Sequence, residues 1–357
     1  MADKQQTNEA LDELGADRTP TRAELEIPDG QAALEGRPEE PSESLAAIIA
    51  AILANIAIGI VKFIAAAVSG SSAMVSEGIH SIVDSGNGLL LLFGMKRASR
   101  KPDIEHPFGY SHELYFWTLV VAVMIFALGG GFSIYEGIHN LVSIGPDTQL
   151  GDPLISYIVI GASFILEGVS LSVALRNFNK ARGTTPPMRF IREAKDPSLF
   201  AVVFEDSAAE LGLIVAFCGV FFGHMFNNPF IDAGASVVIG LLLCVVATIL
   251  LRETKGLLIG EGLRADEMLE VERVVEADPL IIECGRVLSL YLGPDDLLIT
   301  IDATFVEGAS RDDIAEAIDR IEYEIVSEFP QTKRIFIESE SLRETRASAE
   351  AIHASIE

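Results

Sequence analysis

Apolar residues are concentrated in six runs, each about as long as a bilayer is thick. The runs cover residues 44–69, 74–95, 114–138, 153–178, 199–223 and 230–251. A helix rises about 1.5 Å per residue, so about 20 apolar residues cross the hydrocarbon core. In lipid the backbone groups must be hydrogen-bonded within the protein, and a helix satisfies this requirement. The pattern therefore predicts an α-helical membrane protein with a six-transmembrane-helix bundle over residues 44–260.

The two ends of the chain show different patterns. Residues 1–43 contain many acidic residues and prolines without a periodic apolar face, which predicts a disordered acidic N-terminal tail. Residues 261–342 follow a helix–strand–strand–helix–strand pattern, with a capping pattern at Ser310 and Asp313. We expect a small cytoplasmic α+β domain there, followed by a polar C-terminal tail at 343–357. A domain of this size favours a subunit contact.

The loops between the apolar runs alternate in positive charge. The loops near Gly70, Gly145 and Asn227 contain no Lys or Arg. The segments after the second, fourth and sixth runs contain Lys96, Arg97, Arg100, Lys101, Arg176, Lys180, Arg182, Arg189, Arg192, Lys195, Arg252 and Lys255. The positive-inside rule then predicts that both termini are cytoplasmic. We expect a bacterial inner membrane, because this acidic chain shows no targeting signal.

Composition excludes several classes of function. The 357 residues carry a net charge of −26, which argues against nucleic acid as a partner. Three cysteines are too few for a disulfide framework or a thiolate metal cage. The soluble domain shows no nucleophile–base pair and no cofactor motif, so we expect neither an enzyme nor a bound cofactor.

Two ionisable residues lie inside the second apolar run. His80 and Asp84 are one helical turn apart and therefore share a face. An Asp at mid-bilayer costs about 2.5–3.5 kcal/mol, so its presence indicates a use. Imidazole nitrogen and carboxylate oxygen are ligands of divalent cations such as zinc. The alternative is a polar pair that joins helices by hydrogen bonds.

The fifth apolar run begins with three carboxylates. Glu205 shares a face with small residues of the kind that pack closely on neighbouring membrane helices, namely Ala208, Gly212, Ala216, Gly219 and Gly223. Glu205 and Asp206 are therefore expected to face inward, with Glu210 as the next candidate. The alternative is that these acids lie at the level of the lipid headgroups.

Other polar residues in the apolar runs have structural interpretations. Asn87 is expected to form a helix–helix hydrogen bond, or to act as a donor behind the site. Lys62 and Glu167 could neutralise each other inside the bundle, or Lys62 could extend to the interface.

With these residues in hand, residues 44–340 resemble the cation diffusion facilitator family of divalent-metal/proton antiporters. The resemblance is carried by segment 76–87, by loop 102–110 with its His-Pro-Phe-Gly sequence, and by the start of the fifth run. It implies a homodimer, a tetrahedral metal site between the second and fifth membrane helices, and a ferredoxin-like, metallochaperone-like C-terminal domain.

The family's ligands transfer to this chain position by position. His80 and Asp84 match the ligands of the second helix, and Asp206 matches the Asp of the fifth. Val202 stands where the family has His or Asp, so Glu205 or Glu210 must supply the fourth oxygen. The predicted metal ligands are His80, Asp84, Glu205 and Asp206. Zinc is the expected cargo, and three carboxylates with one imidazole make manganese or iron the alternatives.

Two further metal positions of the family are altered here. Asp103 and His106 match a secondary site in the loop, but Tyr110 stands where that site has its next His. The alternative is a structural pair. His353 is the only His after residue 260, so metal regulation by His in the C-terminal domain is not expected.

A metal ion and protons compete for the same lone pairs at such a site. The resulting hypothesis is a divalent metal efflux transporter that exchanges metal for protons across the lipid bilayer. The alternatives are a cation channel, and a membrane metal sensor or scaffold that has lost transport.

Overall fold

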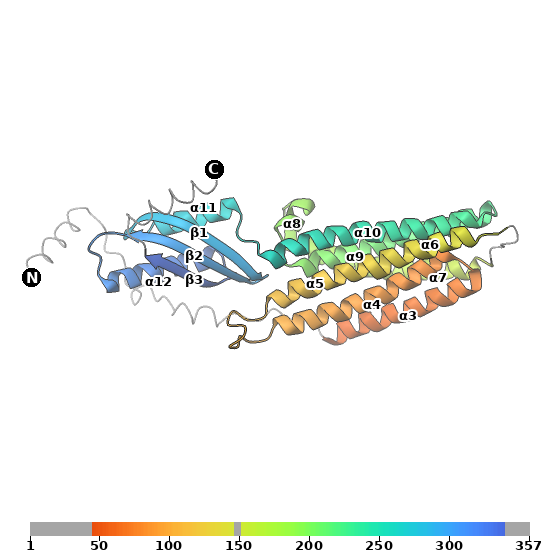
Figure 1. The fold of residues 1–357 in the computed structure, drawn as a ribbon, viewed down its shortest axis with the longest axis horizontal. Coiled ribbons are helices and arrows are strands. Elements are labelled where there is room, and N and C mark those ends of the chain that lie inside the picture. Colours follow the sequence, from red (N-terminus) through yellow and green to blue (C-terminus); the bar gives the residue numbers. More distant parts are fainter. Residues whose placement is uncertain (1–44, 146–150, 340–357) are drawn as a thin grey trace, which may run out of the picture. The chain divides into compact units, whose positions relative to one another are not determined.

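The computed structural model describes residues 45–145 and 151–339 (Figure 1). These residues divide into two compact units. One unit contains the described residues up to Glu261 together with Tyr291–Pro294, and the other contains Gly262–Leu290 and the described residues from Asp295 onward. The predicted tails at 1–43 and 343–357 lie outside the described residues.

The first unit is a bundle of long helices that lie side by side (Figure 1). Its elements are α3 (Leu45–Ser69), α4 (Ser72–Ala98), α5 (His112–Met124), η1 (Ile125–Gly131), α6 (Phe132–Ser143), α7 (Leu154–Arg182), α8 (Pro187–Glu193), α9 (Pro197–Met225) and α10 (Pro229–Ile259). Each apolar run coincides with one long helix, except the third, which is the continuous segment α5–η1–α6. The helical fold class predicted from the sequence is confirmed.

Four of the six predicted spans are long and apolar enough to cross a membrane. They are His112–Ser143, Leu154–Arg182, Pro197–Met225 and Pro229–Ile259. In the part of α3 whose side chains are described, Asn55–Ser69 is a continuous apolar segment. Helix α4 has the length but not the apolarity, because four polar side chains interrupt it: Glu77, His80, Asp84 and Asn87. The residues that weaken the membrane signal of α4 are those that suggest a site.

The middle of the third span is π-helical, which the sequence pattern does not predict. The segment η1 contains Gly129, Gly130 and Gly131 and packs against α10. A Cβ atom added to Gly130 would lie 3.0 Å from the carbonyl oxygen of Gly240, so the two backbones approach closely. Glycine permits this contact, as is typical of tightly packed membrane helices.

The start of α4 is held by a buried carboxylate from α10. Asp232 is 3% exposed, and its Oδ2 accepts a hydrogen bond of 2.7 Å from the backbone N–H of Ser72. The Ser71 hydroxyl donates to Asp232 Oδ1 at 2.6 Å and accepts from the N–H of Met74 at 3.2 Å. Free N–H groups at a helix start need such acceptors. These bonds anchor the N-terminus of α4 against α10.

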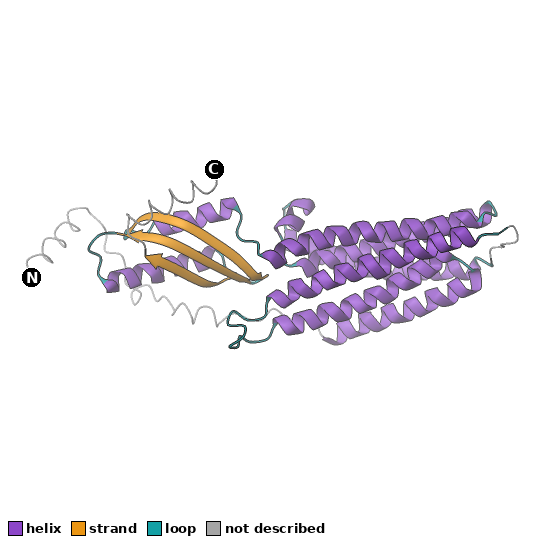
Figure 2. Ribbon diagram, in the orientation of Figure 1, coloured by secondary structure: helices purple, strands orange, loops and turns teal. Residues whose placement is uncertain are grey.

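The second unit is a three-stranded sheet with two helices (Figure 2). Its elements are α11 (Ala265–Glu276), β1 (Ile281–Gly293), β2 (Asp296–Phe305), α12 (Arg311–Glu328) and β3 (Thr332–Ser339). The strand order is β1-β2-β3, and β2 pairs in parallel with β3, with Ile299 opposite Ile335. Parallel neighbours need a crossover, and α12 provides it. The predicted small α+β domain is confirmed.

Local sequence signals explain these elements. Ser310 Oγ accepts from the N–H of Asp313 at 3.2 Å, and Asp313 Oδ2 accepts from the N–H of Ser310 at 2.9 Å, so the predicted cap at the start of α12 is present. In β2 the side chains of Ile299, Ile301 and Ala303 are buried and alternate with partly exposed residues. This period of two buries one face of the sheet.

Replacement of Asp232 by Ala is expected to destabilise the bundle. The N–H of Ser72 would remain buried without its acceptor, which costs about 1–3 kcal/mol. Thermal unfolding of the purified chain in detergent measures the effect. The matched control is Asp152→Ala, because the exposed Asp152 accepts from the N–H of Leu154 at 2.9 Å at the start of α7. An equal loss in the two variants would contradict a special role for the buried cap.

Candidate metal site

Four polar side chains form a stripe along α4. Glu77, His80, Asp84 and Asn87 follow one another at intervals of three, four and three residues, which places them on one face of the helix. Glu77 and Asn87 are fully buried, and His80 is 2% exposed. Helix α4 packs against α3, α9 and α10. The stripe therefore faces the interior of the bundle, and the structure excludes a lipid-facing position for His80.

The predicted pair on α4 is present. Nδ1 of His80 lies 3.3 Å from Oδ1 of Asp84. Both ring nitrogens of His80 and Oδ1 of Asp84 are buried without a hydrogen-bond partner. Buried polar atoms are rarely left unpaired, so these three atoms require an explanation. An imidazole nitrogen and a carboxylate oxygen with free lone pairs can bind a cation.

Glu205 of α9 joins this pair from the opposite helix. The Nδ2 group of Asn87 donates to Glu205 Oε1 at 2.6 Å. The carboxyl groups of Asp84 and Glu205 lie within hydrogen-bonding range of each other. Asn87 thus forms the predicted helix–helix hydrogen bond, and it does so by holding a candidate ligand.

Asp206, the other predicted ligand on α9, is turned toward α7. Its Oδ2 accepts a hydrogen bond of 2.9 Å from the hydroxyl of Ser170, an exposed residue. Val202, one turn earlier, is 38% exposed. In residues 45–145 and 151–339, no group of three or more His, Cys, Asp or Glu side chains is arranged to hold a metal ion. The structure brings Asp84 next to both His80 and Glu205, without closing a three-ligand group, and leaves Asp206 aside.

Glu210 is the most buried of the three acids on α9. The helical wheel, by contrast, made it the last of the three candidates to face inward. It is 8% exposed, and both carboxylate oxygens lack a hydrogen-bond partner. Its Oε1 lies beside Gly168 of α7, only 2.9 Å from where a Cβ atom would be. Glu210 thus approaches α7, whereas Glu205 approaches Asp84.

A buried ion cluster lies next to the pair. Nζ of Lys62 on α3 lies 2.7 Å from Oε1 of Glu167 on α7 and 3.0 Å from Oε2 of Glu77 on α4. The predicted pairing of Lys62 with Glu167 is confirmed, and the alternative that Lys62 extends to the interface is wrong. Sequence reasoning missed Glu77. Its position three residues before His80, on the same helical face, could have revealed it.

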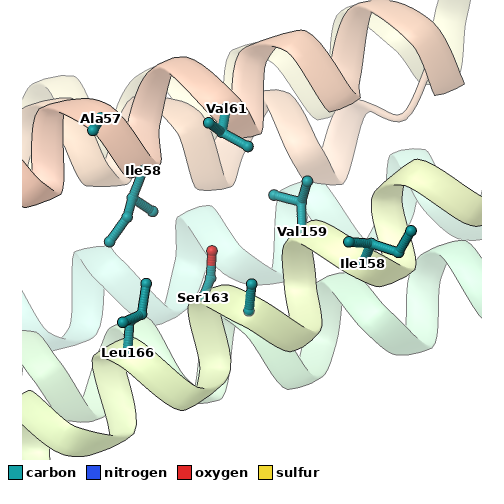
Figure 3. A pocket seen from close by; sticks show the side chains of 8 residues that line it. Ala57, Ile58, Val61, Ile158, Val159, Ser163 and Leu166 are labelled. Carbon is teal, nitrogen blue, oxygen red and sulfur yellow. The ribbon is translucent and has the colours of Figure 1, made fainter.

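An apolar groove of about 290 Å³ lies between α3 and α7. Figure 3 shows Val61 of α3 and Leu166 of α7 among its lining side chains. Lys62 and Glu167 follow these two residues directly in the sequence but do not line the groove, and Lys62 is fully buried.

The loop after α4 contains the second predicted pair. Asp103 Oδ1 accepts from the backbone N–H of His106 at 2.8 Å, and the Tyr110 hydroxyl donates to Asp103 Oδ2 at 2.6 Å. The hydrogen bond from Tyr110 holds the pKa of Asp103 below its usual value. His106 Nδ1 lies 3.6 Å from Asp103. These bonds favour the structural interpretation, in which Asp103 organises the loop.

The chain matches a known family over most of the helical unit. The model of the cation efflux transmembrane domain matches residues 48–259. That range includes the stripe on α4, the acids of α9 and the ion cluster.

Curated relatives show the same affiliation. Metal tolerance protein C4 of Arabidopsis thaliana is 33% identical over 261 residues, which are 72% of this chain and 56% of that protein. The mitochondrial proton-coupled zinc antiporter SLC30A9 of Mus musculus is 34% identical over 65% of this chain and 41% of that protein. Manganese efflux system protein MneS of Bacillus subtilis is 22% identical over 80% of this chain and 92% of that protein. The chain thus spans about half the length of the first two relatives.

Replacement of Lys62 by Met is expected to destabilise the bundle strongly. Removal of one partner from a buried ion pair leaves an uncompensated charge and costs about 3–5 kcal/mol. Thermal unfolding in detergent measures the loss. The double variant Lys62→Met/Glu77→Gln removes a charge of each sign and should recover part of it. If the single variant unfolds at the wild-type temperature, the cluster does not stabilise the fold.

Proposed function

Because the chain belongs to the cation efflux, or cation diffusion facilitator, family, we propose that it exports a divalent metal ion across a membrane in exchange for protons. The observation that carries this proposal is the buried His80–Asp84 pair, which lies next to Glu205. Both ring nitrogens of His80 and Oδ1 of Asp84 have no hydrogen-bond partner. Such atoms are expensive to bury unless a ligand uses them.

The proposed ligands are His80, Asp84, Glu205 and Asp206. Asp84 lies beside both His80 and Glu205, and Asp206 would join them by exchanging its hydrogen bond with Ser170 for the metal ion. Glu205 is preferred to Glu210 as the fourth ligand, because Glu205 contacts Asp84 and Glu210 lies beside α7. Asn87 holds Glu205 in place, as supporting residues of metal sites do.

Zinc is the proposed cargo, with manganese or iron as the alternatives. The name of the Mus musculus relative specifies zinc and proton coupling, and that of the Bacillus subtilis relative specifies manganese. One imidazole with three carboxylates suits zinc, and its oxygen-rich character also suits the harder ions.

Exchange for protons follows from the chemistry of the ligands. A metal ion binds only when the imidazole is neutral and the carboxylates are ionised, so metal and protons exclude each other. After the metal leaves, ionised carboxylates in a low-dielectric bundle are unfavourable, and protons replace it. Movement of α4 and α9 relative to the other helices would expose the site to each side in turn.

The arrangement in the membrane is also part of the proposal. Lys and Arg lie at the C-terminal ends of α4 and α7, which favours a cytoplasmic location for these ends and for both termini. We propose the inner membrane of a bacterium, and a homodimer formed through the C-terminal α+β domain. Neither a channel nor a sensor that has lost transport would couple metal movement to proton movement.

The proposal predicts metal-dependent proton flux in liposomes that contain the purified chain. His80→Ala and Asp84→Ala should abolish this flux, because each removes a ligand. Glu205→Gln should reduce metal affinity by about 10–100-fold or more. The matched variant Glu210→Gln should lower metal affinity less than Glu205→Gln does, because Glu210 lies outside the proposed ligand set. A panel of zinc, manganese and iron identifies the cargo.

Metal uptake into the same liposomes, measured with and without a pH gradient, separates an antiporter from a channel and from a sensor or scaffold. Undiminished flux in His80→Ala and Asp84→Ala would remove this pair from the mechanism. Metal movement that ignores the pH gradient would indicate a channel, and no movement of any metal would indicate a sensor or scaffold.

A further inference from the structure

Four charged side chains from four helices lie close enough inside the bundle to interact electrostatically, beside the proposed metal site. This carboxylate cluster consists of Lys62 of α3, Glu77 of α4, Glu167 of α7 and Glu210 of α9. Lys62 bonds to Glu77 and Glu167 at 3.0 and 2.7 Å, and Glu210 approaches the backbone of α7 at Gly168, next to Glu167. One ammonium group faces three carboxyl groups. If all were ionised, the cluster would hold two uncompensated negative charges.

The hydrogen bonds of the cluster are also incomplete. Lys62 satisfies one oxygen of Glu77 and one of Glu167. Glu77 Oε1, Glu167 Oε2 and both oxygens of Glu210 are buried without a partner. Carboxylates only accept hydrogen bonds, so they cannot satisfy one another while ionised. A proton on one of them removes one buried charge and turns one acceptor oxygen into a donor.

We propose that the carboxylate cluster is a proton-binding site, separate from the metal ligands, that supplies part of the protons exchanged for each metal ion. The inference deepens the proposed function and rests on it. Protons occupy the cluster while the metal site is empty and leave it when a metal ion binds.

The helical spacing on α4 provides the coupling. Glu77 and His80 are three residues apart on one face, so their side chains are neighbours. A doubly charged ion at His80 favours the ionised form of Glu77 and disfavours its protonated form. The other charged groups that face this region are the proposed ligands Asp84, Glu205 and Asp206. Asp232 of α10 is instead bonded to Ser71 and Ser72 at the start of α4.

Protons fit this cluster better than a second metal ion. The Lys62 ammonium already lies between Glu77 and Glu167 and donates to both. A proton needs only one oxygen and one acceptor.

Charge counting gives opposite expectations for two variants. Glu77→Gln lowers the excess negative charge of the cluster from two to one, and Gln can still accept a hydrogen bond from Lys62. Lys62→Gln raises the excess to three. The double variant Lys62→Gln/Glu77→Gln returns the excess negative charge to two. The ratio of protons to metal ions should therefore fall in the first variant, rise in the second and return to the wild-type value in the third, each change being up to about one proton.

The experiment uses the full chain in liposomes with a zinc gradient and with separate dyes for zinc and for internal pH. The initial rates give the proton-to-zinc ratio for the wild type and the three variants. Bound zinc per chain is determined on the purified proteins. If Lys62→Gln fails to fold, Glu77→Gln and Glu167→Gln provide the test, because both should lower the ratio.

The outcomes separate this inference from the proposed function. A wild-type chain without zinc-coupled proton flux would contradict the proposed function itself. If the wild type couples proton flux to zinc but every variant has the same proton-to-zinc ratio, only the proton-binding role of the cluster is overturned. Lys62, Glu77 and Glu167 would then be a structural ion pair network. A second bound zinc ion that is lost in Glu77→Gln would also overturn it, because the cluster would then be a metal site.

Discussion

The structure depends on the need to keep the polar stripe of α4 away from lipid. Lipid offers no partner for an ionisable side chain, so each such residue must find one on another helix. Glu77 finds Lys62 of α3, and Asn87 finds Glu205 of α9. His80 and Asp84 lie between these two contacts and keep unpartnered atoms. The contacts that hold α3, α4 and α9 together thus enclose a site that protein atoms do not satisfy.

Much of this arrangement could be predicted from the sequence. The apolar runs define the helices because backbone groups in lipid must be bonded within the chain. His80 and Asp84 were identifiable because an ionisable pair inside an apolar run is costly, and helical spacing puts both on one face. The same cost made a partner for Lys62 predictable, and Glu167 is that partner. The cap at Ser310 followed from local sequence alone.

Features that depend on packing between helices could not be predicted. A helical wheel gives the direction of a side chain but not its rotamer, so it placed Asp206 inward, whereas the carboxylate bonds to Ser170 of α7. It ranked Glu210 last because it takes no account of α7, whose Gly168 leaves room for that carboxylate. The π-helical segment η1 arises from close contact with α10, which no local pattern in residues 125–131 records.

We propose above all that α4 and α9 together hold the metal ion. The position of the bound ion tests this proposal most directly. The measurement is anomalous scattering at the zinc edge from crystals of the metal-loaded chain. We expect one peak within the bundle, about 2.0–2.2 Å from a ring nitrogen of His80 and from oxygens of Asp84, Glu205 and Asp206. A peak remote from His80, or one coordinated without any residue of α9, would contradict the account.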